Sequence, residues 1–490
     1  MSPRNLLEDP LWNSIDLGEP IPESPHAVSV ALPTWKDIVD YEEQKPHCLN
    51  SLKAIYPRFG LNPLVSEISR KAIESEGLKG FNAWPYPNLR SAQKALSHCK
   101  TRSKESEAFI KNVLGLQCLI TNKTATTYAK EFWQHTGLGA SSRLAAIALN
   151  KEKNPKKVDS SVAEIEIKKR LGSIYGCEKE NIELHPSGMA ALNRILSILC
   201  YFRPKNACLQ LGFPYVDVLK LPQVIFNGSD LLLTHELSKI NIEIERRKPS
   251  AIIVELPSNP MLKCLDLVRV SKIAHEHGIP IIADDTIGSG VNIDSLPYAD
   301  IVFSSLTKSF AGKGDILAGC IIISPYSKWA KDFRLALASE PLAPLSSPDI
   351  IALEEVSRDV NQRIQRLNIS CLELKHKLEK HPLIERVRHP ESCQNFKALM
   401  RPNAGYGCLL SFEIKGGVSK AKSFYDNLEV CKGPSLGTNF TLVCPYVLLA
   451  HYKELDWAHK CGIPSHLIRV SVGLENPEKL WARFEKALAS

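Results

Sequence analysis

The sequence predicts an α/β fold with a mostly parallel sheet flanked by helices. Two observations lead to this prediction. Short apolar runs alternate with an amphipathic helical segment over residues 250–304. Those runs hold few polar residues, which is typical of strands buried on both faces of a parallel sheet. A strand, a helix and a second strand in this order form a βαβ unit, so neighbouring strands are expected to be parallel.

The elements of this unit are marked by their ends and their composition. The predicted strands are Ser250–Leu256, Ile279–Ala283 and Asp300–Ser304. Each is too short for a helix, and the first is rich in β-branched residues. Between the first two strands, Asp266 can cap a helix over residues 267–277, and Gly278 can end it.

The C-terminal part predicts a smaller α/β domain. A proline-rich stretch, 341–348, marks the boundary before it. Apolar residues at helical spacing or in short runs then predict a long helix, two strands around a second helix, and a final helix that begins with proline. These elements are Glu354–Lys380, Gly407–Ile414, Ser419–Leu428, His466–Val472 and Pro477–Ala489.

The N-terminal part gives weaker signals. Residues 1–45 are rich in proline and acidic residues and are expected to form an extended arm. Residues 64–135 have a weak helical pattern that Pro85 and Pro87 interrupt, and the charged segment 150–160 is expected to be an exposed loop. We therefore expect three parts: an arm with an extra helical segment (1–160), a large domain (161–345) and a small domain (346–490).

Composition excludes several classes of function. The chain has 490 residues and a net charge of +8, but its 61 basic and 53 acidic residues are interspersed. Nucleic-acid binding is therefore not expected, and no apolar run approaches the roughly 20 residues of a membrane helix. The N-terminal residues do not resemble a targeting signal, and the scattered cysteines suit reduced thiols, so we expect a cytoplasmic protein without a metal site.

Unusual residues follow two of the predicted strands. Asp284 and Asp285 come after one strand, and Lys308 comes after the next, between hydroxyl residues and a glycine-rich turn. The carboxyl ends of parallel strands meet at the edge of the sheet where ligands bind. A lysine amine that can form a Schiff base, with a carboxylate that can keep a pyridine nitrogen protonated, is what pyridoxal 5′-phosphate (PLP) requires.

A phosphate site is the third requirement. The turn Pro186–Ala191 contains Ser187, Gly188 and Met189, and it opens a helix. Backbone N–H groups at the start of a helix can bind a phosphate, so this turn is a candidate for the cofactor's anion.

These residues together resemble the cystathionine γ-synthase group of fold-type-I PLP enzymes, the Cys/Met-metabolism family. Ser305-Leu306-Thr307-Lys308 matches the family's S-x-T-K motif. The resemblance implies that Lys308 binds PLP as a Schiff base and moves protons, while Ser305 and Thr307 bind phosphate. It also implies a large domain with a seven-stranded sheet, followed by a smaller C-terminal domain.

The resemblance assigns further residues to the cofactor. Asn259, within Glu255–Pro260, would approach the cofactor's 3′-oxygen. Asp284 would face the pyridine nitrogen, whereas Asp285 departs from the family's asparagine. Ser187, Gly188 and Met189 match the phosphate turn. Tyr215 would be the tyrosine that stacks on the ring, and we include it with Lys308 among the catalytic residues.

The substrate side is also implied by the resemblance. Arg469, in Ile468–Glu475, matches the arginine that binds the substrate α-carboxylate. Ser435 belongs to Ser435-Leu436-Gly437, which matches a motif beside that carboxylate. Thr438–Phe440 replace the family's usual glycine, valine and glutamate, which leaves acceptor specificity open.

The N-terminal third departs most from the family pattern. Family members carry a tyrosine and an arginine that contact the phosphate of the neighbouring subunit. Tyr56 and Arg58 resemble that motif in their letters, whereas Arg143 lies closer to its expected place. We favour Arg143 and keep Tyr56 with Arg58 as the alternative. Residues 26–41 and 132–143 resemble the longer fungal cystathionine γ-synthases.

The resemblance implies γ-replacement on an activated homoserine, with O-acetyl-L-homoserine as the expected substrate. The reaction would pass through a vinylglycine-type ketimine, and cysteine as nucleophile would give cystathionine. Three alternatives stay open: a carbon nucleophile such as a β-keto acid in fungal natural-product biosynthesis, a β- or γ-lyase reaction, and a PLP-fold regulatory partner that is not an enzyme. The family also implies a homodimer or homotetramer whose subunits share active sites.

Overall fold

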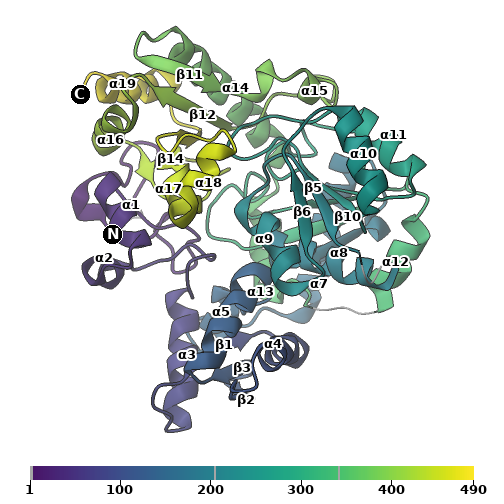
Figure 1. Ribbon diagram of the computed structural model, residues 1–490. Helices are drawn as coiled ribbons and strands as arrows, with labels where there is room; N and C mark the ends of the chain where they lie inside the picture. Colours follow the sequence, from purple (N-terminus) through teal and green to yellow (C-terminus); the bar gives the residue numbers. More distant parts are fainter. Residues whose placement is uncertain (1–3, 203–205, 340–342) are drawn as a thin grey trace.

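Three β-sheets follow one another along the part of the chain that the structure describes (Figure 1). The computed structural model describes residues 4–202, 206–339 and 343–490. A three-stranded sheet comes first, a seven-stranded sheet occupies the middle of the sequence, and a five-stranded sheet comes last. No helix among the described residues is long and apolar enough to cross a membrane. The expected boundary at 341–348 begins at residues outside those described.

The seven-stranded sheet is mostly parallel, as the sequence predicted. Its strand order is β4-β10-β9-β8-β7-β5-β6, and only β10 runs antiparallel to its neighbours. The strands are β4 (Ile182–His185), β5 (Cys208–Leu211), β6 (Ser229–Leu232), β7 (Ile252–Glu255), β8 (Ile281–Asp284), β9 (Ile301–Ser304) and β10 (Gly319–Ile323). The predicted strands thus correspond to β7, β8 and β9, with ends that differ by one or two residues.

Helices cover both faces of this sheet. Alternate side chains of β7 enter two different clusters, Ile252 and Val254 on one face and Ile253 on the other. The first cluster includes residues of α7 (Lys157–Tyr175), α10 (Leu237–Arg247), α11 (Leu267–Glu276) and α13 (Ser347–Val356). The second includes residues of α8 (Gly188–Phe202), α9 (Val216–Ile225) and α12 (Ala330–Ser339). Burial on both faces explains why the strands are continuous apolar runs.

The caps predicted for α11 are present. The side chain of Asp266 accepts a hydrogen bond from the backbone N–H of Arg269. Gly278 follows with a φ of 66°, a left-handed conformation that glycine adopts without strain. A short 3₁₀ helix, η2 (Lys179–Asn181), precedes β4.

The C-terminal sheet is more elaborate than predicted. Its order is β11-β12-β15-β14-β13, and all neighbours are antiparallel except β13 and β14. The strands are β11 (Ile384–Arg388), β12 (Leu409–Ile414), β13 (Cys431–Lys432), β14 (Leu442–Pro445) and β15 (Ile468–Ser471). The helices are α14 (Val360–Lys380), η3 (Pro390–Ser392), α15 (Gln394–Lys397), α16 (Gly417–Asn427), α17 (Tyr446–His451), η4 (Tyr452–Glu454), α18 (Leu455–Lys460) and α19 (Pro477–Leu488).

One predicted helix is divided in the structure. The segment Glu354–Lys380 was expected to be continuous, but α13 ends at Val356 and α14 begins at Val360. The hydroxyl of Ser357 donates a hydrogen bond to the carbonyl of Leu353, 2.7 Å away. Serine competes for backbone partners in this way, and the helix ends there.

The prediction for residues 64–135 was wrong in part, because this region contains a sheet. Its order is β1-β3-β2, and four helices accompany it (Figure 1, lower part). We call residues 63–148 the three-stranded unit. It consists of α3 (Pro63–Ser75), β1 (Asn82–Tyr86), α4 (Leu89–Arg102), β2 (Ala108–Val113), β3 (Leu116–Thr121), α5 (Lys123–Thr136) and α6 (Ser142–Ala148). Pro85 lies inside β1, an edge strand, where a missing N–H is tolerated.

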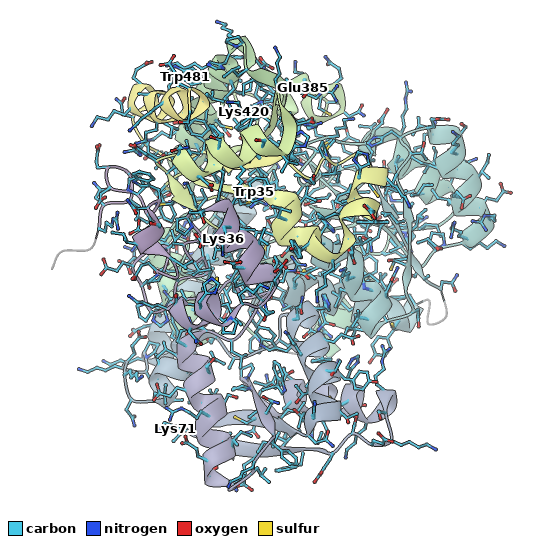
Figure 2. All side chains as sticks on the ribbon, turned by 60° about the vertical axis from the view of Figure 1, so that its left-hand side comes forward. Trp35, Lys36, Lys71, Glu385, Lys420 and Trp481 are labelled. Atoms are coloured by element: carbon cyan, nitrogen blue, oxygen red, sulfur yellow. The ribbon has the colours of Figure 1, made fainter. Side chains whose placement is uncertain are left out.

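The N-terminal arm packs against the C-terminal part. It contains η1 (Ser14–Asp16), α1 (Trp35–Glu42) and α2 (Pro46–Ser51). The backbone N–H of Leu32 donates to the carbonyl of Lys432, and Trp35 meets the ring of Tyr425 edge-on at 6.4 Å. Figure 2 shows Trp35 and Lys36 on α1, next to the C-terminal elements. The same packing carries residues 26–28 and 55–62 to the cavity described below.

Candidate active site

A cavity lies at the carboxyl ends of β7, β8 and β9. Its volume is about 220 Å³. Residues of the arm, the three-stranded unit, the seven-stranded sheet and the C-terminal part all line it. Lys308 and Asp284 both face this one cavity, as the sequence predicted from their positions after neighbouring strands.

Lys308 presents its amine to two hydroxyls. Its Nζ donates to Ser435 Oγ at 3.0 Å and to Tyr56 Oη at 3.3 Å. The amine also lies 5.2 Å from the centre of the Tyr56 ring. The lysine lies in the loop after β9. Gly437, which has a left-handed backbone, packs closely against this loop. A Cβ at position 437 would come within 2.4 Å of the backbone N of Ser309, so a larger residue would not fit there.

Asp284 is a buried carboxylate at the end of β8. Its Oδ1 accepts a hydrogen bond from the backbone N–H of Thr286 at 3.0 Å. Burial raises the pKa of Asp284 to about 6. A carboxylate in this state is stabilised by a cationic N–H donor in the cavity, such as a protonated pyridine nitrogen.

Asp285 has a different role from its neighbour. Both of its carboxylate oxygens accept hydrogen bonds from the hydroxyl of Tyr175, at 2.8 and 3.0 Å. Burial raises the pKa of Asp285 to about 7. Both oxygens of Asp285 are thus bonded to a residue of the protein, and Asp285 does not line the cavity.

The phosphate turn lies at the start of α8 with the loop after β9 against it. Ser187, Gly188, Met189, Ser305 and Thr307 all line the cavity. A Cβ at Gly188 would come within 2.9 Å of the Ser305 Cβ. Glycine is therefore needed for the two segments to approach, and their backbone N–H groups can converge on an anion.

Two of these hydroxyls already have partners in the protein. Ser187 Oγ accepts from the backbone N–H of Ala190 at 3.0 Å, and Thr307 Oγ1 accepts from that of Ala318 at 3.0 Å. Each hydroxyl also donates to a backbone carbonyl, Ser187 to that of Gly137 and Thr307 to that of Ala318, both at 3.3 Å, so each would have to turn its O–H toward a phosphate in order to bind it.

Tyr215 directly precedes α9 and lines the cavity. Its backbone N–H donates to Glu255 Oε2 at 3.0 Å, and its side chain interacts with Tyr56 and Asp217. Burial raises the pKa of Tyr215 well above its usual value. Tyr215 lines the cavity, and its stacking on a cofactor stays a prediction.

Arg469, Asn259 and Ser435 meet on the C-terminal side of the cavity. Arg469 donates to the carbonyl of Ser435 at 2.7 Å and to Asn259 Oδ1 at 3.4 Å. Its guanidinium also lies 4.8 Å from the centre of the Tyr446 ring. The predicted carboxylate site is therefore an arginine held by three neighbours and open to the cavity.

The substituted loop Thr438–Phe440 does not reach the cavity. Its neighbours Pro434, Ser435 and Leu436 line the cavity, whereas the N–H of Asn439 donates to the carbonyl of Gly312 at 2.7 Å. Thr438 and Phe440 are buried behind the lysine loop. The three residues that depart from the family pattern therefore pack against the lysine loop and do not line the cavity.

The two candidate phosphate arginines lie in different places. Arg143 donates to the carbonyl of Asp315 at 2.7 Å and does not line the cavity of its own chain. Arg58 lines it, with Tyr56, but its guanidinium donates to the carbonyls of Leu449 and Ala450. The structure thus brings Tyr56 and Arg58 together with Lys308, and places Arg143 elsewhere.

Several cavity residues were not predicted. Tyr446 has a buried hydroxyl without a hydrogen-bond partner among the described residues, and Trp133 comes from the three-stranded unit. Asp217 and Glu255 are buried acids beside Tyr215. Two of them had a sequence signal that could have been used: Asp217 lies two residues after Tyr215, and Glu255 begins the segment Glu255–Pro260 that contains Asn259.

Comparisons with known proteins identify the family. Residues 166–489 match the family model described as Cys/Met metabolism PLP-dependent enzyme. The chain belongs to this family. It is therefore a PLP-dependent enzyme of the cystathionine γ-synthase-like group, as the motif resemblance indicated.

Relatives extend over nearly the whole chain. A cystathionine γ-synthase of Neurospora crassa is 29% identical over 96% of this chain and 98% of its own length. The cystathionine γ-synthase-like enzyme iboG2 of Amanita muscaria is 28% identical over 99% and 98%. The crystal structure of cystathionine γ-synthase from Xanthomonas oryzae pv. oryzae is 20% identical, with a TM-score of 0.61 over 69% of this chain and 88% of that one, and confirms the fold.

The cavity fits the cofactor of this family. Asp284 is a buried carboxylate without a cationic partner among the described residues, which suits a pyridinium nitrogen. Gly188 leaves room for a phosphate turn, and the Lys308 amine points into the same space. Lys308 would hold the aldehyde carbon, Asp284 the ring nitrogen, and the turn at Ser187–Met189 with Ser305 the phosphate.

Proposed function

We propose that the enzyme catalyses γ-replacement on O-acetyl-L-homoserine, with cysteine as nucleophile and cystathionine as product. The observation that supports this most is the arrangement of Lys308, Ser435 and Arg469. The amine of Lys308 and the guanidinium of Arg469 lie on either side of Ser435. An α-amino acid whose carboxylate binds Arg469 would therefore be held beside the Lys308 amine, which can act as a base.

Lys308 is the group that moves protons. Bound PLP supplies an electron sink for the pair of electrons left at the substrate's Cα. The amine of Lys308, freed when the substrate amine takes its place, removes the Cα proton and then a Cβ proton. It returns protons to these carbons after the nucleophile has added.

Replacement at Cγ balances in atoms and charge. Acetate leaves Cγ with the bonding electron pair, and the thiol of cysteine forms a new bond to Cγ and loses its proton. Arg469 holds the substrate carboxylate, and Ser435 Oγ and Tyr56 Oη keep the lysine amine directed at the cavity.

A second candidate keeps the electrophile and changes the nucleophile to carbon, such as a β-keto acid. The wall formed by the arm and the three-stranded unit favours it, because Ile55, Phe59, Leu61, Val65 and Trp133 give that wall an apolar character. A less polar acceptor loses less hydration in entering such a space than a zwitterion does. Elimination, the lyase reaction, uses the same groups around Lys308 but requires no acceptor.

The assay separates these reactions by product. Purified enzyme loaded with PLP is incubated with O-acetyl-L-homoserine and cysteine, and we expect cystathionine and acetate in equal amounts. Release of a 2-oxo acid and ammonia without cysteine would identify a lyase, and a carbon adduct formed with a β-keto acid would support the second candidate. No turnover with any homoserine ester would contradict all three, as would equal turnover by Lys308→Ala.

Three further parts of the proposal concern the whole molecule. We place domain boundaries near residues 160 and 345, which limited proteolysis tests. We expect a homodimer or homotetramer, which light scattering of the holoenzyme tests. A cytoplasmic location is tested by cell fractionation.

A further inference from the structure

A row of polar side chains leads away from Lys308 under the cavity floor. The amine donates to Tyr56 Oη at 3.3 Å, and the side chains of Tyr56, Tyr215 and Asp217 line the same cavity and interact with one another in that order. Each hydroxyl can donate to the next oxygen, so the row has one consistent direction. It ends on a carboxylate.

Asp217 is deeply buried and lies between two cationic or ionisable groups. Only 2% of the residue is exposed. Its Oδ1 lies 3.2 Å from His135 Nδ1 and 3.3 Å from Arg58 Nε. Burial alone would raise the pKa of Asp217, but Arg58 and His135 hold it below its usual value. Asp217 is therefore an anion at neutral pH.

None of the three facing atoms has a well-formed hydrogen-bond partner. Asp217 Oδ1, His135 Nδ1 and Arg58 Nε are all buried without such a partner among the described residues, although their distances are those of ion pairs. Groups held this way interact mainly through charge, and in a site of low polarity such interactions extend beyond the first neighbour.

His135 belongs to the three-stranded unit. It lies in the last turn of α5, which packs against α8 and α9 of the seven-stranded part. Its side chain reaches from that unit to Asp217, in the first turn of α9. The unit thus contributes a polar group to the region beneath Tyr215 as well as apolar residues to the cavity wall.

We propose that Asp217 and His135 are a positioning pair that acts through Tyr215 and Tyr56 on the amine of Lys308, so that the three-stranded unit sets the proton affinity at that amine. The inference deepens the proposed function, because it rests on Lys308 as the amine that binds PLP. Neither residue touches the reacting atoms, so their effect is on protonation and orientation.

Other groups around the amine must be considered in any pH measurement. Among the described residues, the remaining titratable groups that line the cavity are His26, Glu255, Asp284, Cys444, Tyr446 and Arg469. All of them are unchanged in the variants below, so a shift between variants reports the substituted residue.

The test follows the absorbance of bound PLP as the pH is changed. That absorbance reports protonation at the nitrogen of Lys308, and it needs no substrate. Loss of the carboxylate in Asp217→Asn should disfavour a positive charge on this nitrogen and lower the midpoint pH by about 0.5–1 unit. His135→Leu removes the ring nitrogen beside the Asp217 carboxylate, so less of that negative charge is compensated. The midpoint pH of this variant should therefore rise.

Two matched variants separate this effect from general damage to the fold. His135→Asn keeps an N–H near the position of Nδ1 and should restore the wild-type midpoint. His98→Leu removes another histidine of the same unit whose side chain is equally buried, at 8% exposed. His98 faces Glu131 and Phe132 and does not line the cavity, so its variant should titrate as the wild type does.

The outcomes distinguish this inference from the proposed function. Unchanged midpoints in both Asp217→Asn and His135→Leu, with normal titration of the wild type, overturn the positioning pair alone. An equal shift in His98→Leu also overturns it. If His135→Leu does not fold, Asp217→Asn carries the test, because it is isosteric. A wild-type protein that shows no absorbance of bound PLP overturns the proposed function, and this inference with it.

Discussion

The amine of Lys308 lies 3.0 Å from the hydroxyl of Ser435, and the carbonyl of the same serine accepts a hydrogen bond from Arg469. One residue therefore connects the amine expected to bind the cofactor with the arginine expected to bind the substrate. Ser435 has a φ of 89°, a left-handed conformation that costs a residue with a side chain about 1–3 kcal/mol. The surrounding bonds must hold it there.

Substitution of Ser435 should separate its hydroxyl from its backbone. Ser435→Gly relieves the left-handed strain and keeps the carbonyl for Arg469, so the substrate KM should change little while kcat falls about tenfold through loss of the hydroxyl. Ser435→Ala loses the same hydroxyl but keeps the strain. Steady-state kinetics of the two variants measure this, and a large rise in KM for Ser435→Gly would contradict it.

Arg469 should control substrate affinity. Arg469→Lys keeps the charge but loses the two-pronged geometry, and we expect KM for the amino-acid substrate to rise roughly 10- to 100-fold with a smaller change in kcat. Arg388→Lys is a control, since Arg388 is also a buried arginine of the C-terminal sheet but pairs with Glu413 outside the cavity. Equal effects in the two variants would show that general damage to the sheet, not substrate binding, is responsible.

The raised pKa of Asp284 gives the apoenzyme a specific pH dependence. Burial raises this pKa from 3.8 to about 6, so the folded state binds the proton more tightly than the unfolded chain does. The ionised carboxylate therefore destabilises the fold increasingly between about pH 4 and pH 6, and by a constant amount above that. From the size of the shift, this amount is on the order of 3 kcal/mol.

Asp284→Asn should consequently stabilise the apoenzyme at pH 8 but not at pH 4. Urea denaturation of both proteins at the two pH values measures the difference. The same variant should bind PLP more weakly, because it cannot pair with the protonated ring nitrogen. A variant no more stable than the wild type at pH 8 would show that Asp284 already has a cationic partner in the apoenzyme.

Tyr446→Phe should be tolerated by the fold. The hydroxyl is buried without a partner among the described residues, and such a group costs about 1–3 kcal/mol. Removing it should leave the free energy of unfolding of the apoenzyme unchanged or raise it by about 1 kcal/mol. Because Tyr446 lines the cavity and its ring faces Arg469, a rise in KM at unchanged stability would show that the hydroxyl serves the substrate.

The parts of the fold that could be predicted are those whose signals are local. The strands β7, β8 and β9 are uniformly apolar because both faces of the sheet are covered, and α11 has a capping residue and a terminal glycine. The three-stranded sheet lacks such signals. β1 contains Pro85, and the turn between β2 and β3 has Leu114 before Gly115 at a position with positive φ, where asparagine, aspartate or glycine is usual.

The residues of the candidate site show the same difference between local signals and contacts that only packing creates. Asp284, Lys308 and Arg469 follow or lie in strands, inside motifs that can be recognised within a few residues. His135 and Asp217 are 82 positions apart, and only the packing of α5 on α9 brings them together. The sequence alone left both Arg58 and Arg143 as candidates for the neighbouring phosphate, because the three-stranded unit lies between Arg58 and the large domain.

The most direct test of the account is to find where the cofactor is bound. The holoenzyme is reduced with borohydride, digested, and searched by mass spectrometry for the lysine that carries the pyridoxyl group. We expect the label on Lys308, whose amine points into the cavity with Asp284. A label on another lysine, or a protein that retains no cofactor after reduction, would contradict the assignment of this cavity as the active site.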